Sequence, residues 1–268
     1  MLWSIWEKPI VVATIKTLYL QAPTDQDKAR LLALRQPGAG DWLYAVPSPQ
    51  LGTLLDDESF RVISSLRLGG QVCQPHHCPC GEKVCERGYH GLKCKKSQGR
   101  RSRHEAVNDI ISRALRTAEV PNVREPPGCS REDGKKPDGL TLIPWTRGRS
   151  LVWDFTCSDT LCPTYVTQTA QNPGAAARLA EAKKKRKYSF LENRFIFTPV
   201  AIETLGVYGK EATKFVDAIG ERLKTVSGDL RSLAFLKQKI SLAIQRGNAA
   251  AMLGTLPQGK GFGEIFHL

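Results

Sequence analysis

The sequence predicts a mixed α/β fold in which a small mixed β-sheet is flanked by helices. Two observations favour this class. Between residues 103 and 205, apolar segments follow one another in the order helix, three strands, helix, strand. The composition, with 41% hydrophobic and 24% charged residues in a chain of 268, is that of a folded protein with a core of its own.

The region before this core, residues 1–72, is expected to be mostly helical, with an apolar pattern between residues 29 and 34 and a Gly/Pro-rich break at 37–40. The first twenty residues are fairly apolar, but Glu7, Lys8 and Lys16 interrupt them. We therefore expect neither a signal peptide nor a membrane span, and we expect the protein in the nucleus or the cytosol, where thiols stay reduced.

The core itself is expected to contain a helix over 103–118, strands over 122–125, 138–143 and 150–156, a helix over 174–192 and a strand over 195–202. Pro199 is typical of an edge strand, because proline cannot donate to a neighbouring strand. Amphipathic helices over 210–225 and 228–253 follow. The expected units are therefore a helical linker region (1–72), a zinc knuckle with a basic run (73–102), the core (103–205) and a helical extension (206–268).

A concentration of metal-binding residue types lies between residues 73 and 104, which hold five of the eight cysteines and four of the five histidines. Cys78, Cys80, His90 and Cys94 form a set of four zinc ligands within 17 residues, the donor number of a structural zinc site. Because only one residue separates the first two, Cys73 or Cys85 is an alternative ligand. His76 and His77 are further candidates.

The net charge of +13, from 39 Lys and Arg against 26 Asp and Glu, favours a polyanionic partner, and we expect DNA or RNA. We expect the basic run and the helix that follows it to contact nucleic acid through Lys93, Lys95, Lys96, Arg100, Arg101, Arg103, His104 and Asn108. For His104 and Asn108 a capping or packing role is an equal alternative.

A second set of residues predicts a magnesium-dependent phosphodiesterase. Asp138 and Asp154 belong to neighbouring expected strands, and Asp154 alternates with the apolar side chains of its strand, so both carboxylates are expected at one edge. Lys184 or Lys187 on the following helix supplies the amine, and Glu125 is a candidate third carboxylate. Such carboxylates hold Mg²⁺, and a lysine stabilises the charge that develops during hydrolysis. The alternative is a Pro-Asp-Gly turn and a solvated helix face.

Five motifs in one order, within residues 27–255, carry a resemblance to a known family. They are the segment 42–47, the Cys78, Cys80, His90, Cys94 set, Arg103-His104 with Asn108, Pro137-Asp138 with Asp154, and Lys184 with Lys187-Tyr188. The chain resembles the C-terminal part of the proteins encoded by non-LTR retrotransposons of the restriction-like-endonuclease class.

This resemblance implies a PD-(D/E)XK nuclease core with catalytic Mg²⁺ and a zinc knuckle. Such a nuclease nicks target DNA so that an attached reverse transcriptase can prime on it, with element RNA as a further partner. Thr156 stands where other members of the nuclease superfamily carry lysine, so the resemblance implies that Lys184 or Lys187 supplies the amine. No polymerase motif is seen here. The alternative function is a catalytically inactive nucleic-acid-binding module, a relic or a domesticated fragment.

Overall fold

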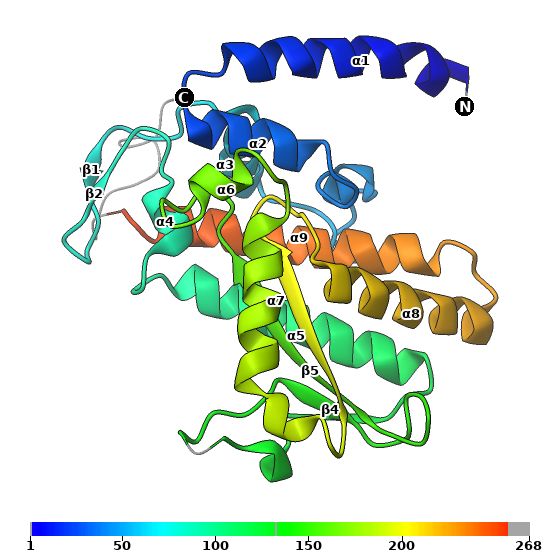
Figure 1. The fold of residues 1–268 in the computed structure, drawn as a ribbon. Helices are drawn as coiled ribbons and strands as arrows, with labels where there is room; N and C mark the ends of the chain where they lie inside the picture. The colour runs from blue at the N-terminus through cyan, green and yellow to red at the C-terminus, as the bar shows by residue number, and fades with distance from the viewer. Residues whose placement is uncertain (1, 132, 257–268) are drawn as a thin grey trace.

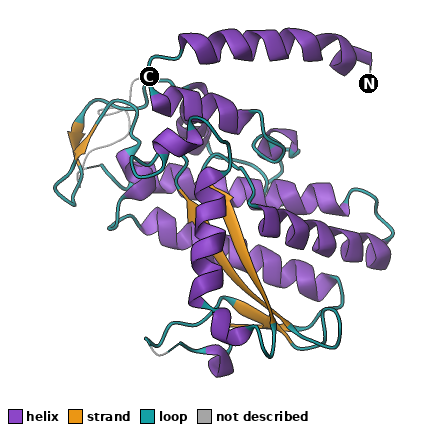
Figure 2. Ribbon diagram, in the orientation of Figure 1, coloured by secondary structure: helices purple, strands orange, loops and turns teal. Residues whose placement is uncertain are grey.

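The computed structural model describes residues 2–131 and 133–256, and it has a mixed α/β fold, as the sequence predicts. Figure 1 follows the chain, and Figure 2 shows a small sheet enclosed by helices. Before the sheet the chain forms α1 (Leu2–Gln21), α2 (Asp25–Leu34), the 3-10 turn η1 (Asp41–Tyr44), α3 (Asp57–Leu68), the short strands β1 (His76–His77) and β2 (Lys83–Val84), and α4 (His90–Lys93).

The four-stranded sheet and its helices follow in the expected order. They are α5 (Gln98–Thr117), β3 (Asn122–Arg124), η2 (Pro127–Cys129), β4 (Gly139–Thr141), β5 (Leu151–Ser158), α6 (Val166–Thr169), α7 (Ala175–Lys187), η3 (Ser189–Leu191), β6 (Ile196–Glu203), α8 (Lys210–Ser227) and α9 (Ser232–Leu253). Two of these differ most from expectation: α5 begins at residue 98 instead of 103, and α7 ends at residue 187 instead of 192.

The sheet has the order β3-β4-β5-β6, in which β3, β4 and β5 pair antiparallel and β6 runs parallel to β5. The connection from β5 to β6 passes through α7, because parallel neighbours need a long crossover. Pro199 lies in β6, which is an edge strand of the described sheet, as predicted.

One face of strand β5 is apolar from Leu151 to Phe155, whereas the other face combines Val152 with polar residues. Leu151, Trp153 and Phe155 belong to the core formed with α5, α8 and α9, whereas Val152 packs with Tyr188 and the other residues beneath the end of α7. This is the alternation that the sequence predicts, since successive side chains of a strand point to opposite faces. Asp154 therefore shares a face with Val152, on the side that α7 covers.

The helix α9 joins two hydrophobic cores. Its N-terminal half, with Ile240 and Ile244, packs in the core of the sheet, and its C-terminal half, with Ala249 and Met252, packs with α2, α3 and the Cys/His-rich segment. The two hydrophobic cores are not divided at the unit boundaries expected at 102/103 and 205/206. The boundary at 102/103 lies inside α5, and the extension 206–268 contributes to both cores as far as it is described; residues 257–268 lie outside the described range.

Close backbone contacts explain why these units merge. A Cβ added to Gly91 would lie 2.6 Å from Met252 Cα, and one added to Gly99 would lie 2.3 Å from Ala251 N. Only glycine permits helices to approach so closely. The segment that carries the cysteines is thus fixed to the backbone of α9.

The first helix contacts the rest through few residues, among them Tyr19, whose hydroxyl donates to Ala170 O at 2.8 Å. Ile10 and Leu20 are largely exposed. Among the described helices, none combines the length and apolar character that a membrane crossing needs.

Candidate metal centre and candidate active site

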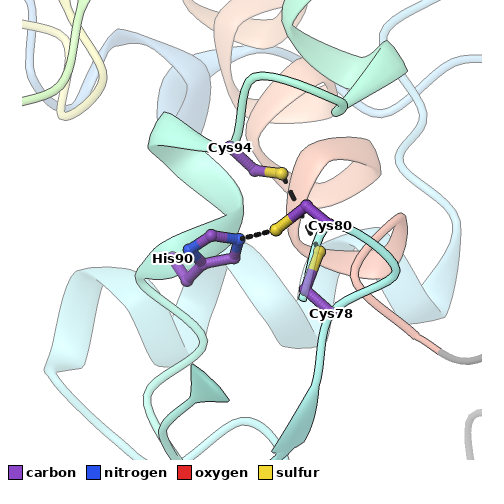
Figure 3. A group of neighbouring side chains, drawn as sticks. All are labelled: Cys78, Cys80, His90 and Cys94. Carbon is purple, nitrogen blue, oxygen red and sulfur yellow. Dashed lines mark hydrogen bonds between the residues drawn. The ribbon is translucent and has the colours of Figure 1, made fainter. Parts of the chain in front are cut away.

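Four predicted ligands converge at one point. The ligand atoms of Cys78, Cys80, His90 and Cys94 all lie within 4.8 Å of one another, and Figure 3 shows the side chains turned toward a common centre. Cys80 Sγ is 3.2 Å from His90 Nε2, and Cys78 Sγ is 3.8 Å from Cys94 Sγ. With Zn–S bonds of about 2.3 Å, a tetrahedral site requires sulfurs ~3.8 Å apart. This cluster could therefore bind a zinc ion.

Local backbone structure sets the positions of the four ligands. Cys78 and Cys80 flank a turn at the tip of the β1–β2 hairpin, where Gly81 has a φ of +96°, a conformation that favours glycine. His90 and Cys94 stand at the two ends of the single turn α4, because the Cys94 N–H donates to His90 O at 2.9 Å. Residues four apart lie on one helix face, which explains the spacing of the second pair.

Protonation links metal binding to pH. Burial raises the pKa of the Cys78 thiol to about 11 in the metal-free chain, whereas the backbone N–H of Glu82 lowers the pKa of Cys80. Burial also lowers the pKa of His90, which favours the neutral ring that a metal needs. A bound metal must displace the Cys78 proton, so its affinity rises with pH.

The alternative ligands point elsewhere. Cys73 Sγ lies 3.4 Å from Cys85 O, and the exposed Cys85 is not part of the cluster. The His76 ring contacts Gln74 O and Thr255 Oγ1, and His77 is exposed. The one-residue gap between Cys78 and Cys80 is thus compatible with a four-ligand site.

The two predicted aspartates lie together inside the molecule. Asp138, which directly precedes β4, is 8% exposed, and Asp154 in β5 is 4% exposed. Asp138 Oδ2 accepts a hydrogen bond from the backbone N–H of Phe155 at 2.5 Å, which ties the first carboxylate to the strand of the second. Burial raises the pKa of Asp154, and the charge of Asp138 adds to that effect against the opposing charge of Lys184.

The two lysine candidates have different surroundings. Lys184 Nζ forms an ion pair with Asp154 Oδ2, and its side chain is 23% exposed. Lys187 is exposed and projects from the last turn of α7, one turn after Lys183. Geometry therefore favours Lys184 as the amine of this site. Glu125 follows β3 with an exposed side chain, and its backbone N–H donates to Asp138 O at 3.1 Å.

Tyr188 is a member of this cluster that the spacing of charged residues in the sequence did not single out for a role. Its hydroxyl lies 3.3 Å from Asp154 Oδ1 and 3.2 Å from Lys136 O, and burial raises its pKa. The Lys187-Tyr188 pair of the resemblance was the available signal. The tyrosine connects the end of α7 to the loop that leads into Asp138.

His104 also belongs to the carboxylate cluster. Its Nε2 lies 3.2 Å from Asp138 Oδ2, and its Nδ1 lies 3.4 Å from Asn108 Nδ2. Asn108 is fully buried, and its Oδ1 accepts a hydrogen bond from Trp153 Nε1 at 3.1 Å. In the neutral ring, Nδ1 accepts from the Asn108 amide and the ring proton lies on Nε2, toward Asp138; in the protonated ring both nitrogens carry a proton, and Nε2–H still faces Asp138.

The expected nucleic-acid contacts are corrected at two positions. Arg103 is only 2% exposed, and its guanidinium donates to Asn248 on α9, while Asn108 is buried as described. Both side chains hold α5 in place and are not available to a nucleic acid. The other five cations of the run are exposed: Lys93, Lys95, Lys96, Arg100 and Arg101. Arg100 also donates to Lys93 O and Cys94 O.

A cavity of about 660 Å³ lies between α5 and α9, and none of the candidate zinc ligands or clustered carboxylates lines it. This cavity therefore does not coincide with either candidate site. No protein-family model matches the chain, and no curated protein is significantly similar to it.

Proposed function

We propose that this chain is a metal-dependent DNA endonuclease similar to the restriction-like nuclease of non-LTR retrotransposon proteins. The observation that carries the proposal is the meeting of two buried aspartates from adjacent strands with a lysine from the crossover helix: Asp138, Asp154 and Lys184. Two buried carboxylates are unusual in a purely structural core, because burying each charge costs several kcal/mol of desolvation unless the charge is paired.

The arrangement of the sheet supports the same assignment. The order of a helix, three strands, a crossover helix and a fourth strand in one mixed sheet is the order that the sequence predicts for the proposed PD-(D/E)XK core. Lys184 reaches Asp154 from the crossover helix, which compensates for Thr156 in the strand position of the superfamily lysine.

The donor set suits a hard divalent cation. Asp138 and Asp154 offer carboxylate oxygens, the ligands that Mg²⁺ prefers, and would hold the ion. Bound there, Mg²⁺ would supply Lewis-acid activation of the phosphodiester and of water. The residues of the chain have their own tasks: Lys184 places a positive charge beside Asp154, and His104 and Phe155 N–H orient the Asp138 carboxylate.

In this proposal the zinc cluster is structural. All four ligand positions come from the protein, which leaves no open position for a substrate. The exposed cations between Lys93 and Arg101 would hold target DNA or element RNA through phosphates. A reverse-transcriptase module is the partner that the resemblance implies, with action in the nucleus.

The experiment is nicking of supercoiled plasmid by the purified zinc-loaded chain with and without Mg²⁺ or Mn²⁺. We expect metal-dependent nicking that Asp138→Ala and Asp154→Asn abolish, while DNA binding in a gel shift persists. Lys224→Ala, on the exposed side of α8, serves as a control. Metal-independent nicking, or equal nicking by the aspartate variants, would contradict the proposal.

A binding module without catalysis is the second candidate, and one observation favours it. Both carboxylates already contact groups of the protein itself, Asp154 with Lys184 and Asp138 with His104, so the cluster also satisfies buried charges without a metal. DNA binding without nicking under every metal condition would support this alternative.

A further inference from the structure

The end of α7 gathers cations from two separate parts of the chain. Lys183 and Lys187 lie one helical turn apart on α7, and Arg131 and Lys135 come from the loop that precedes β4. In Figure 1 the last turn of α7 ends beside this loop. We name Arg131, Lys135, Lys183 and Lys187 the Tyr188 cation cluster, because Tyr188 connects the end of α7 to the loop that carries Arg131 and Lys135.

Specific contacts hold the two parts together. The Arg131 guanidinium lies 5.8 Å from the centre of the Tyr188 ring, and the Tyr188 hydroxyl contacts both Lys136 O and Asp154 Oδ1. The loop is closed by the Arg131 N–H, which donates to Lys135 O at 2.9 Å. One tyrosine ring thus separates this cluster from the proposed catalytic carboxylate.

The cations have little neutralisation among the described residues. Asp133 lies 3.4 Å from Arg131 and 3.6 Å from Lys135, and no ion pair involving Lys183 or Lys187 is formed within that part of the chain. Slight desolvation of the exposed Lys187 ammonium, and then the charges of Lys183, Lys184, Arg131 and Lys135, lower the pKa of Lys187. Crowded like charges destabilise a folded chain, and a polyanion would relieve that repulsion.

The macrodipole of α7 explains two of the four cations, Lys183 and Lys187, but not Arg131 and Lys135. Cations are favoured in the last turn of a helix, which explains lysines at the end of α7. It does not explain why a separate loop brings two further cations to the same place. An exposed aromatic ring, Phe190, lies 6.2 Å from Tyr188 and adds a surface on which a base can stack.

We propose that the Tyr188 cation cluster binds the phosphate backbone of DNA on the side of Asp154 at which α7 ends. Lys183 and Lys187 are about 6 Å apart along the helix axis, close to the rise of two nucleotides in one strand. In this assignment Lys187 binds phosphate and Lys184 alone serves the carboxylates. The position of the cluster beside a cleavage site rests on the proposed nuclease function, whereas DNA binding by the cluster does not.

The test measures binding separately from cleavage. Anisotropy titrations of a labelled DNA duplex use the full zinc-loaded chain with Asp138→Asn, at several salt concentrations and without divalent metal. We expect Lys183→Ala/Lys187→Ala to weaken binding about tenfold or more and to reduce the slope of log K against log salt by roughly 1.8, or about 0.9 for each lost phosphate contact. Arg131→Ala alone should reduce the salt slope by about half as much, roughly 0.9.

A matched control removes the same charge elsewhere. Lys224→Ala/Lys239→Ala takes a half-exposed lysine from α8 and an exposed lysine from α9, and it should leave the salt slope nearly unchanged. If the α7 variant has the affinity and slope of this control, the cluster is not a DNA site. A larger loss of affinity for an RNA duplex of the same sequence than for DNA would also overturn the assignment to DNA.

Plasmid nicking by the chain with native Asp138 then separates the two proposals. If the native chain nicks and the Lys183→Ala/Lys187→Ala variant binds DNA as the control does, the nuclease proposal stands and the cluster is not a DNA site. Weakened binding in a chain that never nicks would retain the cluster and refute the nuclease. Circular dichroism checks that the substitutions, which lie on the surface of α7, leave the fold intact.

Discussion

His104 Nε2 lies 3.2 Å from Asp138 Oδ2 and links α5 to the first residue of the acidic pair. Burial alone would lower the pKa of His104, but the hydrogen bond and charge of Asp138, with Glu105 and Asp154, raise it above its usual value. The same contact and the Phe155 N–H hold the pKa of Asp138 below its usual value, against the effect of burial. The two groups therefore stabilise each other as an ion pair in the metal-free protein.

The first prediction concerns the pH dependence of stability. A histidine whose pKa is raised on folding contributes its full stabilisation below its unfolded value, about 6.5, and loses it as pH rises through the folded pKa. Asp138, whose pKa is lowered on folding, contributes its full stabilisation above its unfolded pKa of about 3.9 and loses it as pH falls through the folded pKa. Urea midpoints in magnesium-free buffer should therefore decline above pH ~6.5, and this decline should be smaller in His104→Gln.

A double-mutant cycle isolates the pair. In Asp138→Asn the histidine has lost its main charge partner, so adding His104→Gln should change the pH profile far less than it does in the native chain. Parallel profiles for the native chain and His104→Gln would contradict an ionic role for this contact.

The second prediction separates the lysines of α7 by kinetics. Lys184→Met should reduce the nicking rate at saturating DNA by about 10²-fold or more, the usual cost of losing one group that stabilises transition-state charge. Lys187→Met should instead raise the DNA concentration needed for half-maximal rate, with little effect on the maximal rate. Lys185→Met is the matched control, because Lys185 pairs with Glu211 on α8. Equal maximal rates for Lys184→Met and Lys185→Met would exclude the assignment of Lys184.

How far the sequence predicts these sites depends on how local their geometry is. The convergence of the candidate zinc ligands could be predicted, because a hairpin turn and one helical turn bring Cys78, Cys80, His90 and Cys94 together. The alternation in β5 follows from a period of two residues and correctly assigned Trp153 and Asp154 to opposite faces.

The buried state of Arg103 and Asn108 could not be predicted in the same way. Arg103 pairs with Asn248, 145 residues later, and a Cβ added to Gly247 would lie 2.3 Å from Arg103 Cβ. A basic run shows which residues carry charge but not which of them a distant helix will cover. The role of Tyr188 likewise depends on how α7 meets the loop before β4.

The third prediction concerns zinc. Because α4 and the start of α5 rest on α9, loss of the metal should destabilise more than the knuckle. Chelation or Cys94→Ser should remove several kcal/mol and lower the melting temperature by about 10 °C or more. Hydrogen exchange should quicken in α4 and in α9 from Gly247 to Leu253. Cys85→Ser is the control, since Cys85 is exposed and outside the cluster. Faster exchange confined to residues 73–97 would show that the knuckle is an independent unit.

The last prediction tests the close approach of α5 and α9. Gly99 is the second residue of α5, and in a free helix its replacement by alanine would stabilise by up to about 1 kcal/mol. Here the new Cβ would lie 2.3 Å from Ala251 N and 2.7 Å from Ala250 C, both backbone atoms that cannot rotate away. The helices would have to separate, and we expect Gly99→Ala to destabilise by roughly 2–3 kcal/mol in chemical denaturation. Gly128→Ala, with no heavy atom within 4 Å of the new Cβ, should change stability by less than about 0.5 kcal/mol. Because α9 also supports the knuckle, Gly99→Ala should weaken zinc binding as well; a stabilised variant with unchanged zinc affinity would mean that the two helices are not in backbone contact.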